Sequence, residues 1–352
     1  MINHRKVAVV ILNWNGSQLL DKFLPSVIKH SSDPDVEVIV ADNCSTDDSV
    51  VNLRQYYTSV RIIELKENYG FARGYNEALK QVKTDYFVIL NSDVEVTENW
   101  IEPVISRMET DNKIAAIQPK ILSYNQKNTF EYAGAAGGFI DKYGYPFCRG
   151  RILNIVEKDE GQYNEATPIF WATGACMFVK AKLFIEHGGF DPDFWAHMEE
   201  IDLCWRLKNR GFSIWYEPKS IVYHLGGATL TYDNPKKIYL NFRNNLLMLM
   251  KNLPAGKFRF ILPFRMILDG VAAIKFLLGF QFKAYWSVLN AHLFLYSHFL
   301  KFYKKRKSLL PYITHPKHKE IFHRGIMLRF FIQKKKKFSQ LKFKIYNAKI
   351  NF

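Results

Sequence analysis

The chain of 352 residues is long enough for one large domain with an appendage, or for two domains. Hydrophobic residues make up 48% and charged residues 23% of it, which excludes a disordered or fibrous protein. The net charge of +16 is uneven, because residues 251–352 hold 22 Lys and Arg residues against only Asp269 and Glu320. This part carries +20 and residues 1–250 carry −4, so the basic character belongs to one end of the molecule.

The cysteines and the first residues indicate the compartment. The four cysteines are widely spaced and include no C-x-x-C pair, which predicts reduced, mostly buried thiols rather than disulfides or a zinc site: Cys44, Cys148, Cys176 and Cys204. The first apolar run, at 7–12, is too short for the apolar region of a secretory signal and fits a buried strand. These features predict a cytoplasmic protein.

Strands and helices alternate in residues 1–120. Short apolar runs rich in β-branched residues predict strands at 7–12, 36–41, 60–65, 86–90 and 114–118. Amphipathic patterns between them predict helices near 17–30, 46–57, 71–82 and 97–110. Wholly apolar strands that alternate with helices predict an α/β fold, with a mostly parallel sheet covered by helices on both faces.

Four consecutive strands end in polar residues, which is where ligands bind in such sheets. The residues at these ends are Asn13 and Asn15, Asp42 and Asn43, Asn68, and Asn91 with Asp93. The Asp42 carboxylate could accept from a nucleoside, or it could form a turn into the next helix. The Asp93 carboxylate could hold a divalent cation together with substrate phosphates, or it could cap the following helix.

The glycine-containing segment 68–74 joins the third strand to its helix. Gly70 and Gly74 would allow a phosphate to approach the backbone at the helix start, and Arg73 adds positive charge. The chain contains neither G-x-G-x-x-G nor a Walker sequence, which disfavours a Rossmann dehydrogenase and a P-loop enzyme.

From 121 to 235 the alternation becomes irregular, with ordered elements predicted at 169–180, 199–210, 212–216, 221–224 and 235–251. The helix near 199–210 begins with Glu199, Glu200 and Asp202. Carboxylates in a first turn favour the helix dipole, but three so close together also repel, which raises the pKa of one toward that of a general base. His224, at a predicted strand end, is a possible metal ligand or an ordinary histidine.

Beyond Pro254 the sequence is rich in aromatic and aliphatic residues and is interrupted by cations, so that no 18-residue stretch is free of charge. This disfavours a transmembrane span. Helices with apolar faces, cationic edges and aromatic residues are typical of the membrane interface, and the Lys/Arg runs at 304–307 and 334–337 would attract anionic lipid. A helical subdomain with solvated lysines is the alternative. Nucleic acid binding is disfavoured, because no nucleic-acid module accompanies the charge.

Seven segments in order resemble a family 2 glycosyltransferase of the GT-A fold, in the bacterial rhamnosyltransferase-like branch. They cover residues 7 to about 230: VAVVILNWNG, ADNCSTDDSV, ENYGFARGYNEAL, YFVILNSDVEV, FWATGACMFVK, GGFDPDFWAHMEEIDLCWRLKNRGF and SIVYHLGGAT. The Arg-Asn-Asn element at 243–245 extends the match. Each segment alone is weak, but seven in order are highly specific.

The resemblance implies roles for the residues of the donor half. Asn13 and Asn15 would line the nucleotide pocket, and Asp42 would contact its base. The donor pocket would be shaped by Asn68, Gly70, Phe71 and Ala72. Asn91 and Asp93 match the first and last positions of the family's D-x-D motif, so that one carboxylate fewer reaches the Mg²⁺ or Mn²⁺ ion. His224 would complete the coordination of that ion.

The resemblance also implies the base. The family's Glu-Asp pair is Glu199-Glu200 here, so Glu200 takes the place of the usual aspartate, and Asp202 or Glu199 is the reserve candidate. On an ideal helix Glu199 and Asp202 share a face while Glu200 points about 100° away. Residues 188–197 and 171–174 would form the acceptor side, with an aromatic platform for a sugar ring.

The function implied is an inverting, metal-dependent transfer of a sugar from a UDP- or dTDP-sugar, with dTDP-rhamnose favoured, to a hydroxyl of a cell-surface glycan or lipid-linked saccharide. Residues 1–235 would form the GT-A domain, with its nucleotide-sugar half at 1–120 and its acceptor half at 121–235. Residues 236–310 would lie peripherally on the inner face of the cell membrane, and 311–352 would be a basic tail. A non-catalytic sugar-nucleotide or glycan-binding protein of the same fold is the alternative.

Overall fold

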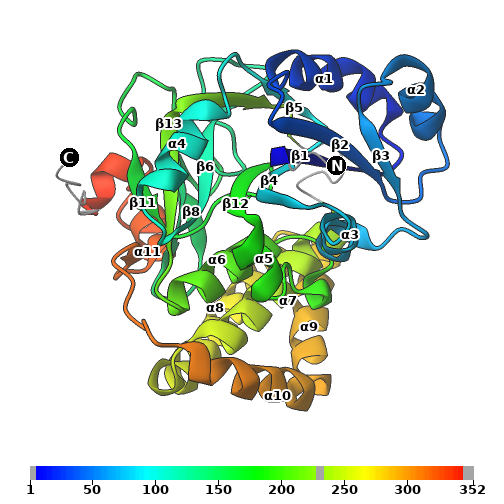
Figure 1. Ribbon diagram of the computed structural model, residues 1–352. Helices are drawn as coiled ribbons and strands as arrows, with labels where there is room; N and C mark the ends of the chain where they lie inside the picture. The colour runs from blue at the N-terminus through cyan, green and yellow to red at the C-terminus, as the bar shows by residue number, and fades with distance from the viewer. Residues whose placement is uncertain (1–4, 227–233, 344–352) are drawn as a thin grey trace.

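The computed structural model describes residues 5–226 and 234–343. A nine-stranded sheet lies at the centre, and helices cover both of its faces (Figure 1). Its strands follow the order β11-β13-β6-β12-β4-β1-β2-β3, and β5 pairs with β13. The bounds are β1 Arg5–Asn13, β2 Val36–Asp42, β3 Arg61–Glu64, β4 Thr84–Leu90, β5 Val94–Val96, β6 Ile114–Ser123, β11 Thr167–Ile169, β12 Cys176–Lys180 and β13 Ser213–His224.

Two groups of helices pack on opposite faces of the sheet. On one face α1, α2 and α4 share a buried hydrophobic cluster with the strands, and on the other face α3, α5 and α6 share a second cluster. These helices are α1 Ser17–His30, α2 Ser49–Tyr56, α3 Gly70–Leu79, α4 Glu102–Thr110, α5 Ala181–Glu186 and α6 Glu199–Asn209. The predicted α/β fold with both faces covered is confirmed.

Strand β1 shows why the sheet needs helices on both sides. Alternate side chains of a strand point to opposite faces. Val7 and Val9 therefore belong to the cluster of α1, and Ala8 and Val10 to the cluster of α3. All four are at most 3% exposed, so each pair would lose its apolar contacts if its helices were absent.

The sheet is parallel where the strand–helix alternation is regular and mixed beyond it. Strand β1 pairs in parallel with β2 and β4, while β12 inserts antiparallel between β4 and β6. The two strands predicted at 212–216 and 221–224 are one strand, β13, with an irregularity in its register between Glu217 and Ile221. Both segments of β13 pair in parallel with β6, so the irregularity does not divide the strand.

A second, five-stranded sheet has the order β10-β9-β8-β7-β14. Its last strand comes from the C-terminal part of the chain, which pairs in parallel with β7. The strands are β7 Gly138–Asp141, β8 Pro146–Cys148, β9 Arg151–Ile152, β10 Ile155–Val156 and β14 Ile321–Phe322. The amide of Ile326 also donates to Asp141 Oδ2, and the amide of Phe338 to Glu157 Oε1. Residues 311–343 of the expected basic tail are thus packed, and residues 344–352 lie outside the described residues.

Four helices form a layer below the central sheet in Figure 1. They are α7 Pro235–Asn252, α8 Ala255–Leu278, α9 Phe282–Ser297 and α10 Phe299–Leu309, and a short helix, α11 Ile326–Phe331, follows β14. Helix α7 lies between α6 and α9 and contacts both. Among the described residues, no helix is long and apolar enough to cross a membrane. The division of the chain at 235 and 310 stays a prediction.

Buried charges join this helical layer to α6. Lys251 of α7 is 1% exposed, and its Nζ lies 2.7 Å from Asp202 Oδ2 and 2.5 Å from Asp191 Oδ2. Arg206 also donates to Asp202 Oδ2 at 2.8 Å. Burial opposes the ionisation of Asp202, but Lys251 and Arg206 outweigh it and lower the pKa of its carboxyl. One buried ammonium therefore neutralises carboxylates from two separate segments.

We expect Lys251→Met to destabilise the protein by about 3 kcal/mol, because it removes the buried cation that Asp191 and Asp202 share. Each carboxylate is left with one cation, Lys305 and Arg206 respectively. Equilibrium unfolding in urea at neutral pH measures this loss. Since the pKa of Asp202 is lowered in the folded chain, its stabilising charge is present above the ordinary carboxyl pKa and is lost as the pH falls toward the lowered value. The difference between the two proteins should therefore shrink in acid. Lys304→Met, at an exposed position of α10, should change the free energy of unfolding little.

Candidate active site

The ends of β1 and β2 form the first part of the site. Asn13 and Asp42 are paired in the parallel register, and Asn13 Nδ2 donates to Asp42 Oδ1 at 3.0 Å. The same carboxylate accepts from the backbone and hydroxyl of Ser45 at 2.8 and 2.6 Å. Asn15 has a φ of 49° and accepts from the amide of Thr46 at 2.7 Å. Asn13 and Asp42 are buried supports, whereas Asn15 is exposed at the edge.

The segment before α3 forms the second part. Asn43 Nδ2 donates to Asn68 Oδ1 at 3.0 Å, and Asn68 Oδ1 accepts from the amide of Gly70 at 2.9 Å. The φ of Gly70 is 71°, and a Cβ atom there would lie 2.6 Å from Nε1 of Trp195. Glycine is therefore required at position 70 both by the backbone and by the indole ring that lies against it.

The first amides of α3 are already occupied. Phe71 and Ala72 donate their backbone N–H groups to the carbonyl of Trp195, at 2.9 and 3.1 Å. The expectation that a phosphate approaches the backbone is not supported at these two amides, because a protein carbonyl takes their hydrogen bonds. These two hydrogen bonds instead join the start of α3 to the loop that precedes α6.

The third part pairs the end of β4 with the end of β13. Strand β5 holds Val94 opposite His224, which places Asp93 beside the imidazole. His224 Nε2 lies 3.0 Å from Asp93 Oδ1, and Nδ1 lies 3.1 Å from Glu131 Oε2. Asn91 Nδ2 is 3.5 Å from the same Nε2. Asn91, Asp93 and His224 were expected at one site and lie together there. Glu131 joins them and was not predicted.

These buried groups shift one another's pKa. Burial alone would lower the pKa of His224, but Asp93 and Glu131 together raise it to about 10. Burial alone would raise the pKa of Asp93, but His224 lowers it below its ordinary value. Asp93 and His224 therefore stabilise each other's charged forms at the carboxyl end of β4.

The residues at this position fit a divalent cation. Within residues 5–226 and 234–343, no group of three or more His, Cys, Asp or Glu side chains is arranged to hold a metal ion. Mg²⁺ and Mn²⁺ in phosphate-transfer sites need only one or two protein ligands, because substrate phosphates and water supply the rest. Asp93 would provide an oxygen, and His224 Nε2 would provide a nitrogen once the cation displaces the proton that Asp93 holds there. Glu131 lies against the other ring nitrogen, as a carboxylate does when it orients a metal-binding histidine.

The three carboxylates at the start of α6 have different surroundings. Asp202 is fully buried and bound by Lys251, Arg206 and Asn252. One oxygen each of Glu199 and Glu200 is buried without a hydrogen-bond partner among the described residues. The structure therefore separates Asp202, which faces α7, from the two glutamates.

The same difference appears in the pKa values. Burial raises the pKa of Glu200 to about 7. Burial and the neighbouring Glu200 raise the pKa of Glu199 well above its ordinary value. At neutral pH, Glu200 is thus the carboxyl of this cluster that can both accept and release a proton.

A strained loop leads into α6 and is held by a residue of α7. Trp195, His197 and Met198 have φ values of 64°, 69° and 72°, which non-glycine residues rarely adopt. Asn244 Nδ2 donates to the carbonyls of Phe194, Ala196 and His197, at 2.9, 2.8 and 2.7 Å. These bonds fix the loop that continues into the glutamates. The sequence pattern named the Arg-Asn-Asn element, but it did not indicate this role.

Of the two segments expected to form the acceptor side, only one offers an accessible aromatic ring. Trp171 is 4% exposed, and its Nε1 donates to the Phe139 carbonyl at 2.9 Å. Trp195 is 37% exposed and contacts Gly70 at the start of α3. Trp171 is a core residue, so a sugar platform in this region would be Trp195.

Comparisons of sequence identify the family of the chain. Residues 8–188 match the family described as Glycosyl transferase family 2. The chain is 24% identical over 285 residues to the N-acetylglucosaminyl-diphospho-decaprenol L-rhamnosyltransferase of Mycobacterium tuberculosis, covering 76% of this chain and 90% of that protein. It is 25% identical over 227 residues to the rhamnosyltransferase WbbL of Escherichia coli, covering 62% of this chain and 83% of that protein.

Comparisons of structure agree in fold. The mannosyltransferase PcManGT of Pyrobaculum calidifontis, solved with GDP-Man and Mn²⁺, has a TM-score of 0.50 at 16% identity, covering 90% of this chain and 88% of that chain. GalNAc-T7, solved with UDP, GalNAc and Mn²⁺, has a TM-score of 0.53 at 17% identity, covering 71% and 48%. The family match spans more than half of the chain. The protein therefore belongs to glycosyl transferase family 2 and is a glycosyltransferase with the GT-A fold.

Proposed function

We propose that this enzyme transfers a sugar from a nucleoside-diphosphate sugar to a hydroxyl group of a saccharide acceptor, with inversion at the anomeric carbon. The observation that carries the proposal is the state of Glu200. Its pKa is raised to about 7, and one of its oxygens is buried without a partner among the described residues. A carboxylate of this kind can take a proton from an alcohol at neutral pH when the alcohol is held against it.

The reaction needs one displacement. Glu200 accepts the proton of the acceptor hydroxyl, and the oxygen forms a bond to the anomeric carbon. The bond from that carbon to the diphosphate oxygen breaks, and the nucleoside diphosphate leaves with the electron pair. Attack and departure occur on opposite faces, so the configuration inverts. The Trp195 ring, at the junction of α3 and the loop, would pack against a sugar with its exposed part, since Lys236 Nζ lies 3.9 Å from the ring centre.

Among the three carboxylates, the surroundings favour Glu200 as the base. The pKa of Asp202 is lowered by Lys251 and Arg206 despite its burial, and its oxygens already accept from these groups and Asn252. Glu199 lies next to Glu200, so removing a proton from both would place two negative charges in one buried site. We therefore assign Asp202 to structure and Glu199 to shaping the charge around Glu200.

Asp93 and His224 would hold a divalent cation, which would offset the negative charge that develops on the departing diphosphate. Glu131 would keep the His224 ring in place. Asn13, Asp42 and Ser45 form a hydrogen-bonded wall at the ends of β1 and β2, where a nucleoside would bind. Asn15 would line this pocket, and the segment of Asn68, Gly70, Phe71 and Ala72 would close its side. These assignments follow the polar ends of parallel strands.

The relatives suggest the donor and the acceptor. Two of them are named as rhamnosyltransferases, and one name specifies N-acetylglucosaminyl-diphospho-decaprenol as the acceptor. By analogy, we propose a dTDP- or UDP-sugar donor, with dTDP-rhamnose first, and a lipid-linked saccharide acceptor in cell-envelope glycan synthesis. Such an acceptor would be met at the inner face of the cell membrane.

The proposal is tested by measuring nucleoside diphosphate release. Purified protein is mixed with dTDP-rhamnose or candidate UDP-sugars, Mn²⁺ and membranes that carry lipid-linked saccharides. We expect release that depends on both donor and acceptor and stops when EDTA removes the metal. Donor binding in a thermal-shift assay without any release would instead favour a non-catalytic binding protein. Product of unchanged anomeric configuration would contradict inversion.

We expect Glu200→Gln to lower kcat by about 10²–10⁴-fold, because the amide cannot accept the proton. Donor binding should be kept. In the unsubstituted enzyme, kcat should rise with pH through about 7, since the base acts only when it is deprotonated. Glu98→Gln, at an exposed position outside the site, is the matched control and should leave the profile unchanged. Near-normal turnover of Glu200→Gln would move the base to another carboxylate.

We expect Asn244→Ala to lower kcat more than it weakens donor binding. The substitution removes hydrogen bonds to three loop carbonyls, and the positive-φ residues would relax away from the geometry that positions Glu200. Steady-state kinetics with the cognate donor measures the split between kcat and KM. Asn241→Ala, one turn earlier in α7, should behave as the unsubstituted enzyme. Equal effects of the two substitutions would refute a specific role of Asn244.

The outer surface of α8 and α9 supports contact with a membrane. One face of α8 is a stripe of exposed apolar side chains at alternating spacings of four and three residues: Phe260, Phe264, Ile267, Val271, Ile274 and Leu278, exposed by 76, 41, 64, 60, 56 and 75%. The spacing places them along one side of the helix. Exposed Phe280, Phe282, Trp286 and Leu293 continue the apolar surface onto α9. A helix whose far side already packs on protein would normally present polar residues to water.

We therefore propose that this apolar stripe enters the membrane interface, with exposed Lys275 and Lys283 near the headgroups. The expected consequence is that Ile267→Asp with Ile274→Asp weakens sedimentation with anionic phospholipid vesicles at least about tenfold. Both positions are exposed, so the fold should be kept. Val51→Asp with Ile185→Asp is the matched control, at positions exposed by 62 and 50% on α2 and α5. Unchanged sedimentation of the α8 variant would show that the stripe does not meet the membrane.

A further inference from the structure

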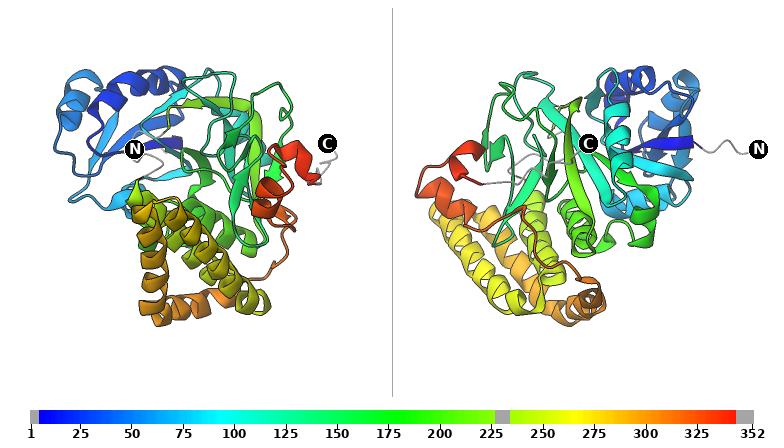
Figure 2. Two further views of the ribbon diagram at one scale, coloured as in Figure 1. Left: turned by 180° about the vertical axis from the view of Figure 1, so that it is seen from behind. Right: turned by 60° about the vertical axis from the view of Figure 1, so that its left-hand side comes forward.

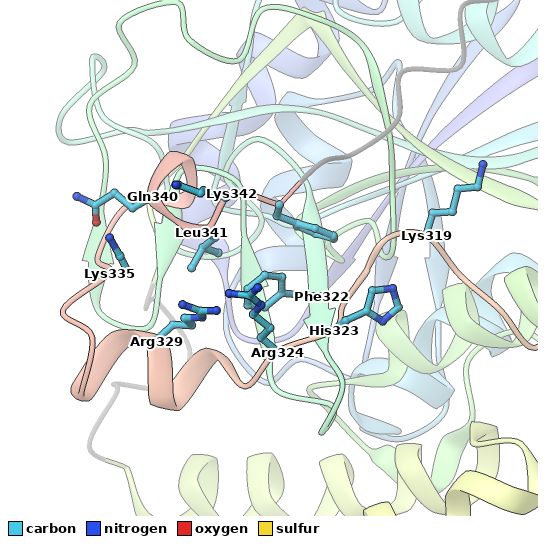
Figure 3. Close-up of a pocket in the computed structure, with 10 residues that line it drawn as sticks. Lys319, Phe322, His323, Arg324, Arg329, Lys335, Gln340, Leu341 and Lys342 are labelled. Carbon is cyan, nitrogen blue, oxygen red and sulfur yellow. The ribbon is translucent and has the colours of Figure 1, made fainter.

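The C-terminal segment contains a pocket outside the site described above. Its volume is about 590 Å³, and it lies between β14, α11 and the turn at Phe338–Leu341. Figures 1 and 2 place this segment at the end of the molecule opposite the β1–β3 half, where the nucleotide would bind. Figure 3 shows Arg324 and Arg329 below Leu341, with Lys335 to its left. The pocket is therefore separate from the donor site.

The lining of the pocket is cationic over an apolar base. Arg324, Arg329, Lys335 and Lys342 are among its residues, no lining residue is acidic, and buried Phe322 and Leu341 form part of its floor. Arg324 and Lys342 are exposed, and Arg329 and Lys335 are half-buried. An anion bound among these four groups would reduce their mutual repulsion. The sequence indicated the charge of this region, but not that the chain folds it around a cavity.

Four of the cations that line the pocket lack a carboxylate partner among the described residues. Glu320 is the only acidic residue from 311 to 343, and it lies 3.2 Å from Lys208 Nζ. Within the parts of the chain that the structure describes, no ion pair involves Arg324, Arg329, Lys335 or Lys342. Arg329 donates through Nη1 to the side chain of Gln333, while its Nε is buried without a partner. The pocket thus has unused donors and positive charge.

The pocket borders the apolar surface that continues from α8. On α11 and just after it, Leu328, Phe331 and Ile332 are exposed by 50, 45 and 71%. Lys275 Nζ of α8 lies 4.9 Å from the centre of the Phe331 ring, so α11 adjoins the helix that carries the apolar stripe. Cations beside an exposed apolar surface match a ligand that has an anionic head and an apolar body.

We propose that this pocket binds a phosphate group, and that the guanidinium groups of Arg324 and Arg329 are its principal donors. Arginine forms paired hydrogen bonds with phosphate oxygens, and Lys335 and Lys342 would add charge around them. The phosphate could belong to the headgroup of an anionic lipid or to a free phosphate ion. The lipid source rests on the proposed membrane contact, whereas binding of free phosphate does not.

The test compares full-length protein with R324Q/R329Q in two measurements. The first is sedimentation with phosphatidylcholine vesicles containing phosphatidic acid, against vesicles of equal surface charge that contain a carboxylate amphiphile. The second is calorimetric titration with inorganic pyrophosphate. We expect about tenfold or greater loss of binding to phosphatidic acid vesicles or to pyrophosphate, and a smaller change with the carboxylate vesicles. The conservative variant R324K/R329K should recover binding only in part, since it keeps the charge and loses the paired geometry.

The matched control is K304Q/K307Q, which removes two exposed charges of α10 outside the pocket. Loss confined to phosphatidic acid vesicles would assign the phosphate to a lipid, and loss confined to pyrophosphate would assign it to a soluble ion. Equal losses in the control and the pocket variant, or equal losses on both vesicle types, would overturn the proposal in favour of diffuse attraction. No loss in either measurement would overturn it as well. Donor binding, measured separately by thermal shift, should be unaffected, so a failure here is distinct from a failure of the proposed enzymatic function.

Discussion

The buried contact between Lys251 and Asp202 determines how the rest of the site can work. It fixes the start of α6 against α7 and consumes one of the three carboxylates that the sequence places together. Asp202 is neutralised there, whereas burial raises the pKa of Glu200, which lies on another side of the helix, to about 7. Lys305 of α10 also reaches Asp191, so ion pairs join α7 and α10 to α6 and the loop before it. The helices after 235 therefore support the proposed site.

The sequence predicted those helices and strands whose ends are marked by neighbouring residues. Helix α1 has the predicted bounds, and the ends of β1, β2 and β4 lie at most two residues from those predicted, because apolar runs and turn residues mark them directly. The second sheet was not predicted, since its short strands depend on pairing with β14 from the far end of the chain. The separate strands predicted within β13 failed for a related reason: Glu217 and Pro218 interrupt the apolar pattern while pairing with β6 continues.

The residues of the candidate site likewise fall into those that the sequence could predict and those that it could not. The polar strand ends could be predicted, because parallel strands bring their carboxyl ends to one edge, and the structure places Asn13 beside Asp42 and Asp93 beside His224. Glu131 could not, since it follows no strand and reaches His224 only through the folded loop. The role of Asp202 was also hidden, because its partner Lys251 lies in a helix whose position the sequence pattern leaves open. The apolar and cationic composition of α8 was predicted from the sequence. Its exposed stripe could be recognised only in the structure, which shows the side of the helix that packs on protein.

The pairing of β7 with β14 has a consequence for how the protein is made. The amide of Ile326 and the carboxylate of Asp141 are 185 residues apart in the chain. During synthesis the strands and helices of residues 5–123 can pack as they leave the ribosome, but the edge of β7 stays open until residues 321 and 322 have emerged. Contacts of such long sequence separation form late. A nascent enzyme would thus acquire its nucleotide half first, and premature termination before 321 would leave an unpaired strand edge exposed to aggregation.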